Sequence, residues 1–409
     1  MKICFFTENY RKGGVDTFLI NLFNAWPKTE DELTLICNAA HAGLATIIEK
    51  TTYPVNIVKY KRIFTSRLAH GQINFILAFP IQLFFSLLFR VLQYPIVFPW
   101  YIFTLTLFFR HTDFERLMVV NGGYPASLLC RSAVIAWKFS GKSSLAIFNF
   151  HSSANQAPWY FRKLEDFIDS MVVNSVDKIV GVSQASLNSL KVRKYFRECD
   201  KLFYIYNGIE DPLSQLSLME SGFKTKGQDS QYCLMLATYE VYKGHSFLFK
   251  SFKRVVKEFP NIRLHIYGFG TAKEKNRVAN EVKRYGLDDF VILNGFVTQT
   301  AQLYLNAQLL TVPSQAYEAF GLTIIEAMAY GLPAVVTDVG GMPELLANSH
   351  SGYVCSKDNS EEFANRVIDI LRNPAIAKEL GRNGRRIFEE RFTALKMAQE
   401  YSFFIRKGC

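Results

Sequence analysis

The chain of 409 residues has few of the features that mark a secreted, disulfide-bonded or metal-binding protein. Its seven cysteines are scattered, odd in number and never spaced as Cys-x-x-Cys, a pattern typical of reduced thiols that argues against disulfides and zinc. No Asp-x-Asp pair is present to hold a divalent metal on phosphates. The apolar run after Met1 is too short for a signal peptide. We therefore expect a cytoplasmic protein that uses neither a metal nor another cofactor.

A nucleic-acid-binding module is also absent from the sequence, because basic and aromatic residues do not combine into a stacking signature. The net charge is nevertheless +11 and the pI is about 9.2, which favours an anionic partner. An acidic membrane face or a phosphorylated small molecule fits this charge better than nucleic acid does. Aromatic residues are abundant, with 36 Phe, so we expect apolar side chains to have a use beyond the core.

The hydrophobic pattern predicts an α/β protein with two Rossmann-like domains. Short β-rich runs alternate with amphipathic stretches, which is typical of parallel sheets with crossover helices. The runs lie at 2–7, 33–37, 55–58, 117–120, 145–150, 178–182 and 202–206, and again at 232–236, 262–267, 290–293, 309–312 and 334–337. The predicted parts are an N-terminal domain over 1–206, a linker over 207–230, a second domain over 231–385 and a last helix over 386–409.

The stretch 73–109 is the most apolar part of the chain. Its two runs are 73–89 and 91–109, and a helix of seventeen residues is about 26 Å long, short of a roughly 30 Å hydrocarbon core. Because the strands before and after this insert must join one sheet, it can cross a membrane an even number of times or not at all. We expect a peripheral or hairpin membrane contact. The alternative is a set of helices packed in the first domain or in a dimer interface.

The segment 313–344 carries the strongest signal for chemistry. A polar loop follows an apolar strand, and helix-forming residues then run as far as Gly331, a common C-terminal stop. Gly321 lies where this helix begins, and the exposed amides and dipole of that end suit a phosphate. Glu326, one turn deeper, can accept hydrogen bonds from two neighbouring hydroxyls such as those of a ribose. Glu318, in the preceding loop, would face whatever lies beyond the phosphate.

A pair of glutamates could instead indicate a glycoside hydrolase, whose two carboxylates lie roughly 5 to 9 Å apart. Eight residues of mostly helical chain rise about 12 Å, which disfavours that pairing. The loop at Glu318 keeps the alternative open. A surface helix with two solvated glutamates is the other alternative, but Gly321 and Gly340-Gly341 accompany the pair and favour a binding site.

This segment resembles the retaining nucleotide-sugar glycosyltransferases of family 4 (glycosyl transferases group 1), which carry a Glu-x7-Glu signature at this place. The resemblance implies the GT-B fold, in which two Rossmann-like domains face each other across a cleft and the last helix crosses back to the first domain. It also implies that Glu318 contacts the donor sugar and that Glu326 binds the ribose hydroxyls. The backbone amides of Phe320, Gly321 and Leu322 would hold the distal phosphate.

A second phosphate-binding element of the family is matched in part. Lys243 follows the strand 232–236 and would neutralise the diphosphate, although a lysine in a loop is otherwise usually solvent-facing. Thr238 stands where the family usually supplies an arginine, so one half of the cationic clamp is missing. We take both residues as donor-side. In the absence of a metal motif, a lysine and a helix dipole would stabilise the charge of the leaving group.

Strand ends of the first domain complete the predicted site. Gly13 and Gly14 follow the first strand, where glycine lets backbone amides approach a donor, although such corners often need glycine for shape alone. His151 occupies the family's position for a histidine facing the donor sugar; without the resemblance it would be taken for a structural hydrogen-bonder. Asn121 and Tyr124 are expected on the acceptor side. The predicted catalytic residues are Glu318, Lys243 and His151.

We therefore expect a retaining, metal-independent glycosyltransferase that moves a sugar from a nucleoside diphosphate to a hydroxyl of a glycan or glycolipid. Cell-surface polysaccharide or lipopolysaccharide synthesis at the inner face of the cytoplasmic membrane is the expected setting. One alternative is a sugar-nucleotide epimerase of the same fold. The other is a catalytically silent, membrane-associated scaffold that binds nucleotide sugars, which Thr238 in place of the usual arginine supports.

Overall fold

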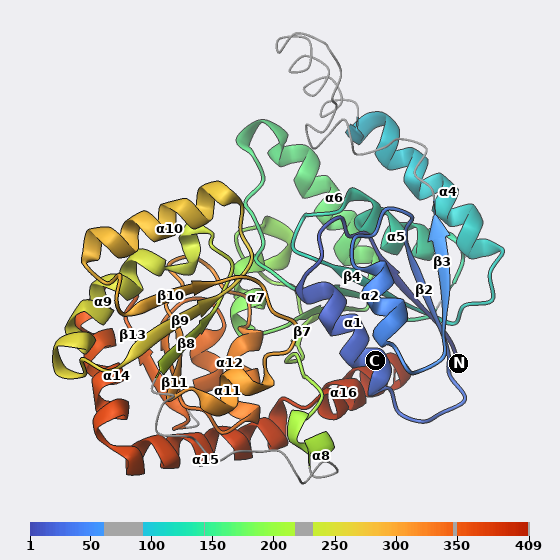
Figure 1. Ribbon diagram of the computed structural model, residues 1–409. Coiled ribbons are helices and arrows are strands. Elements are labelled where there is room, and N and C mark those ends of the chain that lie inside the picture. The colour runs from blue at the N-terminus through green and yellow to red at the C-terminus, as the bar shows by residue number, and fades with distance from the viewer. Residues whose placement is uncertain (61–92, 143, 217–231, 347–349, 408–409) are drawn as a thin grey trace. The chain divides into compact units, whose positions relative to one another are not determined.

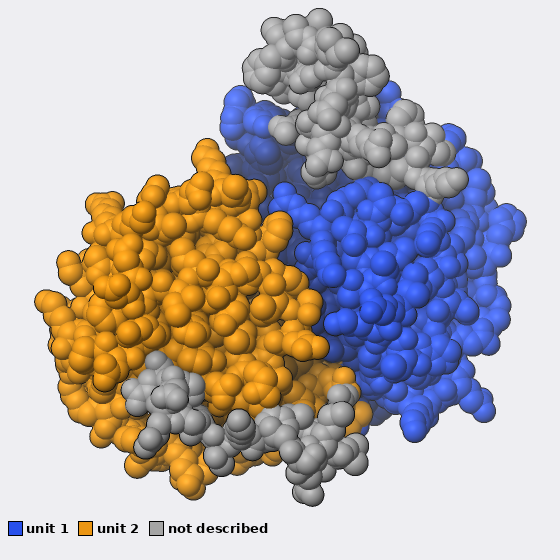
Figure 2. All heavy atoms as spheres, viewed as in Figure 1, with its two compact units in different colours: residues 1–182, 186–205, 398–409 blue, residues 183–185, 206–397 orange. Residues whose placement is uncertain are grey.

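The computed structural model describes residues 1–60, 93–142, 144–216, 232–346 and 350–407. The chain divides into two compact units, drawn in different colours in Figure 2. Unit 1 contains residues 1–182, 186–205 and 398–409, and unit 2 contains residues 183–185 and 206–397. Each unit is built around one parallel sheet with helices beside it (Figure 1), so the predicted α/β fold with two Rossmann-like domains is confirmed.

The sheet of unit 1 has seven strands in the order β3-β2-β1-β4-β5-β6-β7, all parallel. Its strands are β1 (Lys2–Thr7), β2 (Glu32–Asn38), β3 (Val55–Tyr60), β4 (Arg116–Asn121), β5 (Ala146–Phe150), β6 (Lys178–Gly181) and β7 (Leu202–Tyr204). The central strands read as continuous apolar runs and are buried along nearly their whole length. That pattern is typical of a parallel sheet covered by helices on both faces.

Helices of unit 1 lie between these strands, and α5 (Leu128–Phe139) is the most deeply buried of them. Its Trp137 packs against Phe109 of α4, with ring centroids 5.2 Å apart. The other helical elements are α1 (Gly14–Asn24), α2 (Leu44–Lys50), the π-helical turn η1 (Gln93–Val97), α4 (Phe98–Arg110), η2 (Trp159–Phe161), α6 (Arg162–Ser175), α7 (Gln184–Leu190) and η3 (Lys194–Phe196).

The sheet of unit 2 has six parallel strands in the order β10-β9-β8-β11-β12-β13. They are β8 (Tyr232–Leu236), β9 (Arg263–Tyr267), β10 (Val291–Asn294), β11 (Leu309–Val312), β12 (Ala334–Thr337) and β13 (Gly352–Cys355). The sequence predicted the first five of these and missed β13, a short edge strand that begins with glycine and is only partly buried. Because β8 and β11 are neighbours at the centre, the loops that follow them meet at one edge.

The helices of unit 2 are η4 (Val241–Lys243), α8 (Pro212–Leu216), α9 (His245–Glu258), α10 (Ala272–Tyr285), α11 (Ala301–Asn306), α12 (Leu322–Ala329), α13 (Met342–Leu346), α14 (Ser360–Arg372) and α15 (Pro374–Arg391). The segment predicted as a last helix over 386–409 contains the end of α15, at Arg391, and then α16, which runs over Ala394–Lys407. The residues of α16 from 398 onward group with unit 1.

The apolar stretch predicted over 73–109 is described only from residue 93. The run 73–89 lies outside the described residues. In the second run, α4 buries Phe98, Tyr101 and Phe109 in the core of unit 1. These residues therefore agree with the alternative prediction, in which the helix packs in the first domain. In the part of the chain that the structure describes, no helix is both long and apolar enough for a membrane span.

Candidate functional site

The site predicted in the second domain lies at the carboxyl edge of the sheet in unit 2. The loop after β8 carries Lys243, and the loop after β11 carries Glu318. The two side chains form an ion pair, with Nζ 2.5 Å from Oε2, and both are about four-fifths buried at 19% and 23% exposure. Residues 75 positions apart in sequence are thus brought together by the pairing of β8 with β11. The structure thus brings two of the predicted site residues into direct contact.

Backbone segments approach so closely around Lys243 and Glu318 that two positions there require glycine. Gly244 has φ +80°, and a Cβ there would lie 1.8 Å from the carbonyl oxygen of Pro313. The amide of Gln315 donates to the carbonyl of Tyr242 over 2.7 Å, which fastens the two loops together. Gly340 has φ +59°, and a Cβ there would lie 1.9 Å from the carbonyl oxygen of Glu318. Only glycine has both the conformation and the space at these two positions.

The backbone beside Glu318 is held by two further contacts. The amide of Gly341 donates to the carbonyl of Glu318 over 2.8 Å. The hydroxyl of Ser183 donates to the carbonyl of Ala319 over 2.6 Å, and Ser183 is fully buried. Ser183, which the sequence analysis does not single out, thus positions the loop that carries Glu318. No local pattern reveals this, since its partner lies 136 residues away.

The helix α12 begins where the sequence predicted, with Gly321 as its N-cap at φ +105° and Gly331 in the left-handed conformation after its end. The side chain of Phe320 is buried against Tyr206, at a ring-centroid distance of 5.9 Å. Leu322, the first helical residue, directs its amide out of the end of the helix, as all first-turn amides do. The end of α12 therefore presents backbone donors and the positive end of the helix dipole beside Glu318.

Glu326 lies one turn into α12 and accepts a hydrogen bond from the phenol of Tyr304 on α11, at 2.5 Å. Burial raises the pKa of Glu326, and the hydrogen bond from Tyr304 opposes that rise. Tyr304 is buried and stacks on Tyr330, with ring centroids 5.4 Å apart. The sequence analysis missed Tyr304, which orients the carboxylate predicted to bind the ribose. The two glutamates therefore have separate partners, Lys243 and Tyr304.

Replacing Tyr304 by Phe is expected to raise the KM for the donor about tenfold and to leave kcat nearly unchanged, because a hydrogen bond to a charged group is lost. The same bond favours the ionised carboxylate, so its loss raises the pKa of Glu326 further. The carboxylate then becomes protonated at a higher pH, and the acid limb of kcat/KM shifts to higher pH. Steady-state kinetics as a function of pH measure both effects.

Tyr232→Phe is the matched control for this experiment. The Tyr232 phenol donates to the carbonyl of Leu303, the residue before Tyr304, and it touches no carboxylate. The control should leave the position of the acid limb unchanged. An equal shift of that limb in both variants would show that Tyr304 has no specific effect on Glu326.

The loop after β8 has an arrangement of its own at Thr238. Its hydroxyl donates to the carboxylate of Glu240 over 2.7 Å, and the Tyr242 phenol donates to the same oxygen over 2.9 Å. Where the family usually has an arginine, this chain thus has a hydroxyl that binds an acidic neighbour. Thr238 is partly buried and supplies no positive charge.

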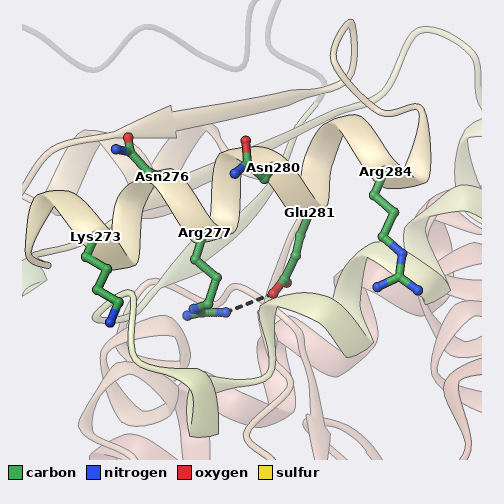
Figure 3. A pocket seen from close by; sticks show the side chains of 6 residues that line it. All are labelled: Lys273, Asn276, Arg277, Asn280, Glu281 and Arg284. Atoms are coloured by element: carbon green, nitrogen blue, oxygen red, sulfur yellow. Dashed lines mark hydrogen bonds and ion pairs between the residues drawn. The ribbon is translucent and has the colours of Figure 1, made fainter.

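A guanidinium from α10 reaches the same loop. Arg277 donates to the carbonyl of Tyr239 over 2.6 Å and to the carboxylate of Glu281 over 3.0 Å. Figure 3 shows Arg277 and Glu281 in a polar groove along α10 whose lining also includes Lys273, Asn276, Asn280 and Arg284. Burial, followed by the positive charge of Arg277, lowers the pKa of His245 at the start of α9 to about 4. The positive charges of Arg277 and Lys243 thus lie near this loop together with the carboxylates of Glu240 and Glu281.

The glycine turn of unit 1 lies after β1, as predicted. Gly13 and Gly14 are exposed, and α1 begins at Gly14. The carboxylate of Asp16 accepts from the amide of Gly13 over 2.9 Å, and its other oxygen lies 2.7 Å from Nε2 of His41. The turn is thus closed by a buried carboxylate that sequence reasoning missed. The sequence signal for this contact is an acidic residue, Asp16, three positions after the N-cap residue Gly13.

His151 follows β5, and its amide donates to the carbonyl of Asn121 over 3.1 Å. The imidazole packs against Phe18, with ring centroids 4.3 Å apart. Burial lowers the pKa of His151 to about 3, so the ring is neutral at physiological pH. Its Nε2 is buried and has no hydrogen-bond partner among the described residues. A neutral imidazole can accept or donate one hydrogen bond there, but it does not carry a positive charge at neutral pH.

The side chain of Tyr124, which the sequence analysis places on the acceptor side, is buried. Tyr124 is 1% exposed, and its phenol donates to the buried carboxylate of Asp169 over 2.6 Å. Asn121 is also 1% exposed, and its amide group binds the backbone of Gly122 and Gly123. The turn after β4 therefore directs both side chains inward, where they hold the turn, and only its backbone can face a ligand.

Tyr124 belongs to a buried ion cluster, which we define as Arg131, Glu165, Asp169 and Arg193 together with the phenols of Tyr94 and Tyr124. Arg193 donates from Nε to Asp169 over 2.7 Å and also contacts Glu165, and Arg131 donates to Glu165 over 3.0 Å. All four charged side chains are at most 3% exposed. The two carboxylates are thus matched by two guanidiniums. The hydrogen bond of Tyr124 to Asp169 ties the turn after β4 to this cluster.

Among the described residues, no three His, Cys, Asp or Glu side chains lie close enough together to hold a metal ion. Metal independence nevertheless stays a prediction. The roles assigned to Glu318, Lys243, Glu326 and the amides of α12 also stay predictions, now with a defined geometry.

Comparison with known proteins agrees with this geometry. Residues 220–387 match the family model "Glycosyl transferases group 1". N-acetyl-alpha-D-glucosaminyl L-malate synthase from Bacillus anthracis is 24% identical over 231 residues, which is 56% of this chain and 59% of that protein. Poly(ribitol-phosphate) alpha-N-acetylglucosaminyltransferase from Staphylococcus aureus is 29% identical over 148 residues, 36% of this chain and 29% of that protein. The matched part thus spans well under two thirds of these relatives.

The crystal structure of Anabaena HepE in complex with UDP has a similar fold over the full length. It superposes with a TM-score of 0.71 at 18% identity, covering 98% of this chain and 99% of that one. At this identity the likeness shows the fold alone. Residues 220–387 thus match the glycosyl transferases group 1 family, and the fold of the chain is GT-B.

Proposed function

We propose that the chain is a retaining, metal-independent glycosyltransferase that moves a sugar from a nucleoside diphosphate sugar to a hydroxyl of a glycan or glycolipid. One observation carries the proposal: Lys243 and Glu318 form an ion pair beside the end of α12 that exposes backbone amides. A cation, amide donors and a carboxylate in one place suit a diphosphate joined to a sugar. The family match and the UDP bound to the HepE structure support the same donor class.

In this proposal each part of the site acts on a different part of the donor. The amides of Gly321 and Leu322 bind the distal phosphate, and Lys243 offsets the negative charge that grows on it as the glycosidic bond breaks. Glu318 faces the sugar and stabilises the positive charge that develops at the anomeric carbon. Glu326, oriented by Tyr304, binds the ribose hydroxyls.

The bond changes balance without a further reactant. The bond from the anomeric carbon to the phosphate oxygen breaks, and a bond from that carbon to the acceptor oxygen forms on the same face of the sugar. The acceptor proton passes to the departing phosphate oxygen. No strong general base is needed for this step, which is consistent with a neutral His151.

The donor can be identified by thermal unfolding of the purified chain with UDP, GDP, ADP and their sugars. A nucleotide at a hundredfold its Kd should stabilise the protein by roughly 2.7 kcal/mol and raise the Tm by a few degrees. Incubation of the stabilising nucleotide sugar with glycan and lipid-linked acceptors should then release the nucleoside diphosphate. NMR of the product gives the anomeric configuration, and a chelator should leave the rate unchanged.

Other outcomes of this experiment separate the alternatives. An epimer formed from the donor without an acceptor would favour the epimerase. Nucleotide binding with neither hydrolysis nor transfer would favour the silent scaffold, to which the hydroxyl of Thr238 lends support. An inverted anomeric configuration in the product would contradict the proposed retaining mechanism. Activity that a chelator abolishes and added Mg²⁺ restores would contradict metal independence.

We also propose that the enzyme works on cell-surface glycans at the inner face of the cytoplasmic membrane. The Staphylococcus aureus relative is named for a poly(ribitol-phosphate) acceptor, which supports a cell-surface product. The described cysteines are all free thiols, which suits a reducing compartment.

A further inference from the structure

Two helices of unit 1 expose large apolar side chains to solvent. On η1 and α4 these are Ile96, Trp100, Phe103 and Leu107, and on η2 and α6 they are Trp159, Tyr160, Leu164 and Phe167. We call these eight residues the aromatic face; Phe108 of α4 is exposed as well but lies off the stripe. Trp159 is 82% exposed, Tyr160 62% and Phe167 60%. Both helices can be followed in Figure 1, α4 in cyan and α6 in green.

The spacing of these residues places them on one side of each helix. Positions 96, 100, 103 and 107 are separated by four, three and four residues, which forms a single stripe along a helix. The opposite side of α4 carries Phe98, Tyr101 and Phe109, which are buried in the core. The helix is therefore apolar on both sides, and Arg110 is its only charged residue. A helix whose outer side faces water usually carries polar residues on that side.

The two halves of the aromatic face lie close together at the start of each helix. The ring of Tyr94 in η1 packs against Phe161 at the start of α6, with centroids 5.2 Å apart. The Tyr94 phenol donates to Glu165 of α6 over 2.6 Å. Tyr160 directly precedes Phe161 and Ile96 follows Tyr94 by two residues, so the two halves of the aromatic face begin beside each other.

The charges that border the aromatic face are mostly positive. Arg162 and Lys163 are exposed directly after Tyr160, and Arg110 ends α4. The carboxylates of Glu165 and Asp169, on the same helix, point inward to the guanidiniums of the buried ion cluster. Asp166 is partly exposed and is the one acid of the first two turns of α6 that remains near the surface. The rim thus presents cations because the nearby carboxylates are neutralised inside.

We propose that the aromatic face docks on an anionic lipid bilayer, with the two helices lying in the plane of the membrane. Trp and Tyr favour the interface between headgroups and hydrocarbon, and Arg and Lys bind anionic headgroups. The thirteen residues of α4 make about 20 Å of helix, too short to span and long enough to lie on the surface. A symmetric contact with a second copy would instead bring Arg162 and Lys163 of two chains toward each other. The inference deepens the proposed localisation and does not depend on the transfer reaction.

The sequence between β3 and η1 adds to the argument for lipid. Residues 61–92 lie outside the described residues, but their sequence starts with Lys61-Arg62 and contains the apolar run 73–89. This segment enters the described chain at Gln93, next to Tyr94 and Ile96. A basic and apolar segment therefore leads directly into the aromatic face.

Sedimentation of the full chain with lipid vesicles tests the proposal. The wild type should bind vesicles of phosphatidylcholine containing phosphatidylglycerol and bind vesicles of phosphatidylcholine alone much more weakly. A triple variant with Trp159→Ser, Tyr160→Ser and Phe167→Ser should bind at least about tenfold more weakly. A double variant with Arg162→Gln and Lys163→Gln should lose about 10- to 30-fold on anionic vesicles and little on neutral ones.

The matched control removes two equally exposed rings from unit 2. A variant with Phe269→Ser and Phe296→Ser, each 66% exposed in the wild type, should bind vesicles as the wild type does. Unfolding curves show whether each variant is folded. If the triple variant does not fold, quenching of wild-type tryptophan fluorescence by brominated lipids replaces it, because Trp100 and Trp159 are exposed and the other two tryptophans are buried.

Equal vesicle binding by the wild type and the triple variant, or no quenching by brominated lipids, would overturn the proposal. Equal binding to neutral and anionic vesicles would overturn the role of the basic rim. A dimer that forms in solution and is lost in the triple variant, without vesicle binding, would identify a second copy as the partner instead. Transfer assays on soluble acceptors are a separate measurement, so failure of docking and failure of the proposed reaction can be told apart.

Discussion

A Glu318→Gln variant is expected to lose about 10²- to 10³-fold in kcat while it still binds the nucleoside diphosphate. The substitution keeps the size of the side chain and removes its charge. In the proposed reaction the carboxylate of Glu318 stabilises positive charge at the anomeric carbon, a contribution realised mainly in the transition state. Lys243, its partner at 2.5 Å, stays in place to bind phosphate. The rate of transfer and the nucleotide-induced shift in Tm measure the two effects separately.

Glu361→Gln is a suitable control for this variant. Glu361 is also in unit 2 and pairs with Arg254 at 2.7 Å, but it is exposed and lies at the start of α14. The control should have the wild-type kcat. A Glu318→Gln variant with kcat within about twofold of the wild type would remove the carboxylate from the mechanism, and loss of nucleotide binding would show that its main effect is on the fold of the loop.

The second large effect is expected on stability. Replacing Arg193 by Met leaves Asp169 and Glu165 buried with one guanidinium between them, and removal of one partner from a buried pair costs about 3 to 5 kcal/mol. Arg193 also binds the carbonyl of Asn155 over 3.1 Å, and that bond is lost as well. All four tryptophans belong to unit 1, so unfolding in urea followed by tryptophan fluorescence reports on this unit.

Lys2→Met provides the comparison for the buried residue, because Lys2 is also in unit 1. Lys2 forms ion pairs with Asp113 and Glu32, and all three side chains are at least 40% exposed. Such surface pairs contribute little to stability, so the control should unfold almost as the wild type does. If Arg193→Met lowered the free energy of unfolding by no more than Lys2→Met, the ion cluster would have no special role in stability.

The arrangement of strands could be predicted because each strand has a local signal. The runs 2–7, 232–236, 309–312 and 334–337 match β1, β8, β11 and β12 at both ends, since apolar β-branched residues are bounded by polar loops. β13 was missed because an edge strand pairs on one side only and needs no apolar run. Local pattern thus predicted the central strands and the edge strands β3, β7 and β10, but not the short strand β13 that begins with glycine.

The direction of side chains at strand ends could not be predicted in the same way. Tyr124 follows a strand whose end was correctly placed, yet its phenol points inward to Asp169, 45 residues later in the chain. Tyr304 orients Glu326 from a helix 22 residues before it, and Ser183 holds the loop of Glu318 from much farther away. These contacts depend on tertiary packing, and no local spacing reports them. Glu318, Lys243 and Gly321 were predictable because glycines and charges recur around them in a known pattern.

The buried ion cluster also determines how unit 1 responds to a displacement at its surface. An unbroken series of side-chain hydrogen bonds leads from Tyr94 through Glu165, Arg193 and Asp169 to Tyr124. Glu165, Asp169 and Arg193 are buried, so displacing one of them would leave a charge without a partner where water cannot solvate it. The turn after β4 and the segment that enters α4 are therefore joined through one buried set of side-chain hydrogen bonds.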